Sequence, residues 1–146
     1  MRRILVCMVM LVWFGQATAD ARLDLETYEG QVVLVDFWAS WCVPCRRSFP
    51  WMNEMQEKYA DDGLVIIAIN LDNSPGDATA FLEEYSVRFE IAYDADKSLA
   101  RKFGVQAMPT TFLLSRKGDV IDSHMGFKVK QQAEYEAAIV AALAAD

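Results

Sequence analysis

The sequence predicts an α/β fold in which a central mixed β-sheet is flanked by helices. Apolar runs of strand length alternate along the chain with segments whose large apolar residues recur at helical spacing. No internal repeat, low-complexity tract or interdomain linker interrupts this alternation. The chain has 146 residues, of which 53% are hydrophobic, so it is long enough for one domain with a substantial core.

The N-terminus has the features of an export signal. Arg2 and Arg3 form a charged start, residues 4–14 an apolar run, and residues 17–19 (Ala-Thr-Ala) a small-residue cleavage site. We expect a cleaved signal peptide over residues 1–19 and the folded domain over residues 20–146. The alternative is an uncleaved membrane anchor, although the apolar run is shorter than the roughly 20 residues that a spanning helix needs. Cleavage would remove Cys7 and leave two cysteines.

The expected mature domain is acidic. Loss of residues 1–19 removes two of the 14 basic residues and none of the 21 acidic ones, so the formal charge changes from −7 to −9. Such a charge argues against nucleic acid and anionic lipid surfaces as partners. Together with the export signal it indicates a periplasmic protein, in a compartment where disulfides persist. A monomer is the default expectation.

The first predicted elements are a strand and a helix. Residues 32–38 are apolar apart from Asp36, which is typical of a buried strand. Pro44 fits the first turn of the helix that follows, whereas Pro50 removes an interior hydrogen bond and should kink it. The helix is expected to end near residue 59, before the polar residues 61–63 (Asp-Asp-Gly). The residues near helical spacing that indicate it are Phe49, Met52, Met55 and Tyr59.

The rest of the chain continues the alternation. Residues 64–71 are almost all apolar, which predicts a strand covered on both faces in a parallel sheet, and residues 72–76 break it. A short helix is expected at 81–85, with Phe81, Leu82 and Tyr85 as its apolar positions. A strand is expected at 89–93, where apolar residues alternate.

The last elements are a helix, a hairpin and a helix. Leu99 and Phe103 indicate a short helix that Gly104 closes. Residues 110–115 and 120–124 flank a polar turn and predict two antiparallel strands. A terminal helix is expected where Tyr135, Ile139 and Leu143 line one side.

Cys42 and Cys45 form a vicinal dithiol where the first strand passes into the first helix. A disulfide across two residues stabilises a fold by only about 2 kcal/mol in the chain-entropy model, so such a pair suits redox exchange better than structural cross-linking. The free N–H groups and dipole at a helix start favour a thiolate at Cys42, which we therefore expect to be the nucleophile. Cys45 follows one helical turn later and is expected to resolve a mixed disulfide.

Asp36 is the one acidic residue of the first strand. A carboxylate buried there would have a raised pKa, and behind the dithiol it could take the proton of Cys45 as a general base. The alternative is that strand pleating turns it toward water. Arg46 and Arg47 follow the dithiol and are expected to be a solvated helix face.

Residues 35–45 (VDFWASWCVPC), with Met108-Pro109-Thr110 downstream, resemble the thioredoxin superfamily. The segment 74–94 resembles the insertion of its extracytoplasmic TlpA/ResA-like branch. The resemblance implies a thioredoxin-like fold with a TlpA-like αβ insertion. The segment 20–31 is short for this family, so its N-terminal strands are expected to be reduced or absent.

The resemblance also implies roles near the dithiol. Pro109 would be a catalytic cis-proline facing the active site, and the backbone of Met108 would pair with an extended substrate. Trp41 would cover the dithiol, the alternative being an ordinary, partly buried aromatic residue. Gly126 occupies the place of a family glycine near the substrate. No cofactor beyond the Cys42–Cys45 disulfide and no metal is expected, and roles for Glu83 and Glu84 are left open.

The leading interpretation is a periplasmic thiol:disulfide oxidoreductase that reduces protein disulfides. A membrane thiol-reducing electron donor would then reduce its own disulfide back to the dithiol. By the resemblance, apocytochrome c or a metal-centre assembly factor would be consistent substrates, which places cytochrome c biogenesis among the expected processes. A disulfide oxidase or isomerase is the alternative within the same chemistry.

Two interpretations come from other classes. A copper-binding thiol carrier would use Cys42 and Cys45, with His124, Met108 or Met125 as further ligands. A peroxidase of the peroxiredoxin type ranks last, because the residues before Cys42 lack the Pro-x-x-x-Thr-x-x-Cys context.

Overall fold

The computed structural model describes residues 24–145. Its five strands form one mixed sheet in the order β3-β2-β1-β4-β5. Strands β1, β2 and β3 are parallel, whereas β4 and β5 run antiparallel to their neighbours. The strands are β1 (Val32–Trp38), β2 (Leu64–Asn70), β3 (Glu90–Tyr93), β4 (Thr110–Leu114) and β5 (Val120–Met125). The predicted α/β fold with a central mixed sheet is confirmed.

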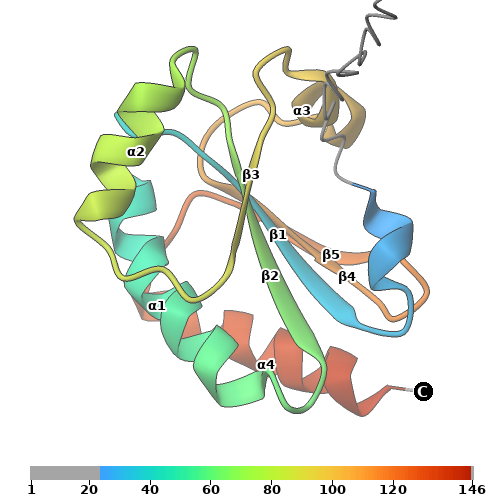
Figure 1. Ribbon diagram of the computed structural model, residues 1–146. Coiled ribbons are helices and arrows are strands. Elements are labelled where there is room, and N and C mark those ends of the chain that lie inside the picture. The colour runs from blue at the N-terminus through green and yellow to red at the C-terminus, as the bar shows by residue number, and fades with distance from the viewer. Residues whose placement is uncertain (1–23, 146) are drawn as a thin grey trace, which may run out of the picture.

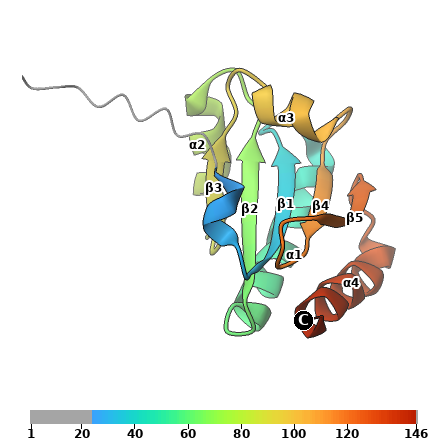
Figure 2. The ribbon, with the colours of Figure 1, turned by 90° about the vertical axis from the view of Figure 1, so that its right-hand side faces the viewer.

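Helices cover both faces of the sheet. In Figure 1 the sheet is seen nearly edge-on, with α1 and α2 on one side and α3 and the 3-10 helix η1 on the other. Figure 2 looks onto the sheet from the side of η1 and α3. The helices are η1 (Leu25–Tyr28), α1 (Val43–Tyr59), α2 (Pro75–Glu83), α3 (Ser98–Phe103), η2 (Val129–Gln131) and α4 (Gln132–Ala144).

The start of the chain is described from residue 24 onward. The expected signal peptide, residues 1–19, lies outside this part. Between residue 24 and β1 the chain forms only η1, so the described residues contain no strand before β1, as expected from the short polar segment. Within residues 24–145 no helix is long and apolar enough to cross a membrane.

Strand β1 divides the core into two layers. All seven of its residues are buried. Successive strand side chains point to opposite faces of the sheet. Leu34 and Trp38 pack in one layer with residues of α1, α2 and α4. Val35 and Phe37 pack in the other layer with residues of α3 and β4. The cysteines belong to the first of these layers. The dithiol therefore lies against the α1 side of the sheet.

Two aromatic residues lie outside the elements predicted for them. Helix α2 ends at Glu83, so Tyr85 follows it, and β3 begins at Glu90, so Phe89 precedes it. Both rings pack on Phe49 of α1, at centroid distances of 5.6 Å for Tyr85 and 5.3 Å for Phe89. These two rings thus join the core by packing on Phe49 from outside the helix and the strand.

Candidate active site

The dithiol lies at the start of α1. Cys42 is the N-cap residue, and its sulfur accepts a hydrogen bond from the backbone N–H of Cys45 at 3.3 Å. The two cysteines form a disulfide, with Cα atoms 5.3 Å apart. Cys42 is 3% exposed and Cys45 is fully buried. A backbone N–H aimed at the Cys42 sulfur is the arrangement that favours a thiolate when the disulfide opens.

Asp36 lies in the middle of β1 and is fully buried. The alternative that strand pleating turns it toward water is therefore wrong. Its Oδ1 accepts a hydrogen bond of 2.6 Å from the Thr111 hydroxyl, and its Oδ2 has no partner among the described residues. Burial raises the pKa of Asp36 to about 7, against the opposing effect of the Thr111 hydrogen bond. A carboxyl with this pKa can exchange a proton near neutral pH.

The side chain of Asp36 faces the layer that contains the dithiol. Strand alternation gives it the same face as Leu34 and Trp38, which pack in one cluster with Cys42 and Cys45. The structure thus brings the acid and both cysteines to one side of the sheet. This arrangement suits transfer of a proton between a thiol and a buried carboxyl.

The loop that carries the dithiol is held by a residue that sequence reasoning missed. Asp72 is buried, and its carboxylate accepts hydrogen bonds from the Ser40 backbone N–H at 3.0 Å and from the Ser40 hydroxyl at 3.0 Å. Asn70 adds a side-chain hydrogen bond to Asp72 at 2.8 Å. The available signal was topological, because the carboxyl ends of parallel strands meet at one edge and Asp72 closely follows β2.

The segment before β4 lies beside Gly126. The Met108–Pro109 peptide is cis, as the resemblance implied, and Pro109 is buried. The backbone N–H of Gly126 donates to the carbonyl of Pro109 at 2.7 Å, and the Thr110 hydroxyl donates to the carbonyl of Ala107 at 2.7 Å. Gly126 has φ 77°, a left-handed conformation that favours glycine. These bonds fix the loop that precedes β4.

Apolar side chains next to Cys42 are exposed. Trp41 is 70% exposed and Val43 is 65% exposed. Trp41 is therefore not the partly buried aromatic residue of the alternative interpretation. Large apolar side chains in water on both sides of a redox cysteine form a surface that a protein partner could cover.

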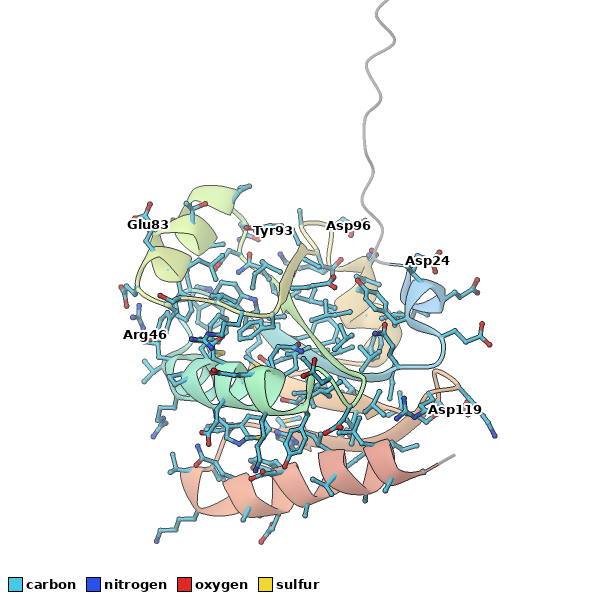
Figure 3. All side chains as sticks on the ribbon, turned by 60° about the horizontal axis from the view of Figure 1, so that its bottom comes forward. Asp24, Arg46, Glu83, Tyr93, Asp96 and Asp119 are labelled. Atoms are coloured by element: carbon cyan, nitrogen blue, oxygen red, sulfur yellow. A yellow bond between two sulfur atoms is a disulfide. The ribbon has the colours of Figure 1, made fainter. Side chains whose placement is uncertain are left out.

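Arg46, the residue after Cys45, pairs with Glu84, which directly follows α2. Its guanidinium lies 2.5 Å from the Glu84 carboxylate and over the ring of Phe81 at 5.1 Å. Figure 3 shows Arg46 on the side of α1 toward α2, while Glu83 projects outward. Glu84 thus offsets the positive charge of the residue that follows Cys45, and Glu83 is exposed.

His124 lies on β5 and stacks on Tyr135 of α4, with ring centroids 3.9 Å apart and planes 7° from parallel. Met125, the next residue, is 59% exposed. Within residues 24–145, no three Cys, His, Asp or Glu side chains form a group that could hold a metal ion. The copper-carrier interpretation gains no support from these contacts.

Comparison with known proteins gives consistent matches. The Redoxin family model matches residues 14–139. The thiol-disulfide oxidoreductase ResA of Bacillus thuringiensis subsp. konkukian is 34% identical over 113 residues, which cover 77% of this chain and 65% of that protein. The thioredoxin-like protein YneN of Bacillus subtilis is 36% identical over 114 residues, 76% of this chain and 66% of YneN. The chain thus spans slightly less than two thirds of the length of these relatives.

A solved structure is more similar. A Chlorobium tepidum protein assigned as a DsbE thiol:disulfide interchange protein is 47% identical, with a TM-score of 0.80 over 82% of this chain and 84% of that one. StoA from Bacillus subtilis is 25% identical, with a TM-score of 0.64 over 74% of this chain and 84% of StoA. The chain belongs to the Redoxin family and is a ResA-like member of the thioredoxin superfamily.

Proposed function

We propose that this protein is an extracytoplasmic thiol:disulfide oxidoreductase that reduces protein disulfides through Cys42 and Cys45. The observation that carries the proposal is the disulfide at the start of α1 on the same side of the sheet as the buried Asp36. The names of ResA and the DsbE-like protein support the same chemistry. The signal-like residues 1–19 support export.

The proposed reaction passes two electrons to the substrate. The Cys42 thiolate attacks one sulfur of the substrate disulfide, and the other substrate sulfur leaves as a thiolate and takes a proton from water. Asp36 then accepts the proton of Cys45, whose thiolate attacks the Cys42 sulfur. The second substrate thiolate leaves, and the Cys42–Cys45 disulfide remains. A membrane thiol-reducing donor returns two electrons and two protons.

The proposed substrate surface surrounds Cys42. Trp41 and Val43 supply exposed apolar area, and Met108 with cis-Pro109 supplies a backbone edge for an extended segment of substrate. The acidic charge favours encounter with neutral or basic proteins. Apocytochrome c and metal-centre assembly factors fit this description and are the substrates that we propose to test first.

The reducing direction rests on the residues between the cysteines. The residues between the cysteines are Val43 and Pro44, so the position before Cys45 is a proline and not a histidine. A histidine at that position would stabilise the reduced thiolate and favour oxidation of substrates. Potentials in this superfamily span about −270 to −120 mV, which corresponds to about 7 kcal/mol, so the surroundings of the dithiol set the direction.

Trapping of the mixed disulfide tests the proposed chemistry. Reduced Cys45→Ser protein should accumulate a mixed disulfide with a model protein disulfide on a non-reducing gel, because the resolving thiol is absent. Cys42→Ser is the matched control and should trap none, since Cys45 is fully buried. Equal trapping by both variants, or a wild-type protein that reduces no disulfide, would refute the proposal.

A further inference from the structure

Three polar side chains lie in register across adjacent strands. Asp36 on β1 is opposite Thr111 on β4, and Thr111 is opposite His124 on β5. Directly opposite residues of antiparallel strands share one face of the sheet, with Cβ atoms about 4.5–5.5 Å apart. The hydrogen bond from Thr111 to Asp36 shows that the first two side chains meet. The row leads from the centre of the sheet to its edge strand.

Both ends of this row carry a buried polar atom without a partner among residues 24–145. These atoms are Oδ2 of Asp36 and Nε2 of His124. Unpaired buried polar atoms cost stability, so their presence calls for an explanation. His124 as a whole is half-buried, so its ring reaches from the interior toward the surface. An imidazole in this position can accept a proton on one nitrogen and release one from the other.

A small cavity is lined by both Thr111 and His124. It has a volume of about 10 Å³, and Thr111, Asp122 and His124 are its polar lining residues. This volume accommodates about one water molecule, which would bridge the hydroxyl and the imidazole if the two groups do not meet directly. The remaining lining residues are aliphatic apart from Tyr135, whose ring stacks on the histidine and whose hydroxyl donates to Gln131.

We propose that Asp36, Thr111 and His124 form a proton path between the buried active-site acid and solvent. The inference rests on the proposed function, since it provides the exit for the proton that Asp36 accepts from Cys45. In the structure the Thr111 hydroxyl donates to Asp36, so the step requires this bond to reverse: protonated Asp36 donates to the Thr111 oxygen. The Thr111 hydroxyl then gives its proton to Nε2 of His124, directly or through one water molecule in the cavity. The imidazole then releases a proton from Nδ1 to water. No electrons move in this step.

The surroundings of His124 favour this role. Burial lowers the pKa of its imidazole from the usual 6.5, and the neighbouring Asp122 opposes this shift. The ring is therefore mostly neutral at pH 7, with a nitrogen free to accept. The groups that face it are Asp122 on its own strand, Tyr135 from α4 and Thr111 from β4.

A buffer-rescue experiment on the whole protein tests the path. The assay is steady-state reduction of a model protein disulfide in dilute buffer near pH 7, with a chemical dithiol as electron source. His124→Phe keeps an aromatic ring against Tyr135 but cannot carry a proton. Turnover should slow about tenfold. This is less than the 10²-fold or more that loss of a general base costs, because Asp36 is still present. Added imidazole should restore the rate. A wild-type rate for His124→Phe, or a defect that imidazole does not relieve, would overturn the proposal.

The interior step has its own matched pair of variants. Thr111→Val removes the hydroxyl and should slow turnover. Imidazole should not restore the rate, because the missing proton carrier is buried and added imidazole cannot reach its position. Thr111→Ser keeps the hydroxyl and should retain most of the rate. Ser123→Ala, an exposed change beside His124, is the control and should leave turnover unchanged. Equal rates for the valine and serine variants would contradict the path.

A titration separates this inference from the proposed function. The chain has one histidine, so its ring gives a single set of NMR signals. In the oxidised wild-type protein the His124 ring shifts should show a second inflection near the pKa of Asp36, about 7, and Asp36→Asn should abolish it. If the wild-type protein reduces no disulfide, the proposed function fails, and this titration still shows whether Asp36 and His124 are coupled, as the path requires. A wild-type curve without the second inflection overturns it.

Discussion

Replacement of Asp36 by asparagine should change the pH dependence of stability. The pKa of this carboxyl is raised from 3.8 to about 7 by complete burial. Because the folded state holds the proton more tightly than the unfolded state, ionisation of Asp36 opposes folding. The penalty is absent below about pH 4, grows by about 1.4 kcal/mol per pH unit, and reaches about 4 kcal/mol above pH 7.

Urea unfolding of the oxidised wild-type and Asp36→Asn proteins from pH 4 to pH 8 measures this effect. Asparagine places a buried N–H₂ near the position of Oδ2, which adds a constant cost of about 1–3 kcal/mol. The difference between the two proteins should still move in favour of the variant by about 4 kcal/mol between the ends of the range. Other titrating groups cancel in this comparison. A difference that does not depend on pH would refute the assignment of Asp36 as a buried acid with a raised pKa.

Two further variants test the supports of the site. The hydrogen bond from Thr111 lowers the pKa of Asp36, so its loss in Thr111→Val should raise this pKa further. Thr111→Ser keeps a hydroxyl and should leave the pKa unchanged. The pH midpoint of the stability change measures the Asp36 pKa in each variant. Asp72→Ala should lower the free energy of unfolding by about 2–4 kcal/mol and slow disulfide reduction, because it frees the loop at Ser40. Ser40→Ala keeps the backbone bond to Asp72 and should cost about half as much; equal losses in urea unfolding would contradict this division.

The fold followed from patterns that are local in the sequence. Strands β1 and β2 were predicted because their apolar runs are continuous, and α1 because its apolar residues recur at helical spacing. The ends of α2 and β3 were misplaced because Tyr85 and Phe89 pack on Phe49 from loop positions that adjoin these elements. Such tertiary contacts override local period in short elements.

The site was predictable where one residue stood out from its surroundings. The two cysteines are recognisable by their spacing, and Asp36 is the only charged residue in an apolar strand. The cis peptide at Pro109 was expected from the family resemblance alone. Asp72 required knowledge that the ends of β1 and β2 meet. The row that ends at His124 depends on the register of β4 with β5, which no local pattern specifies.

The reduction potential of the Cys42–Cys45 disulfide tests the central claim most directly. The purified protein would be equilibrated in graded dithiol buffers and its thiols trapped, with Cys42→Ser as the control. A two-electron transition near −270 mV, roughly the thioredoxin value, is the result that a reductase requires. A transition near −120 mV, roughly that of a strong oxidant, would contradict the reducing direction, and the absence of any two-electron transition would contradict the redox function itself.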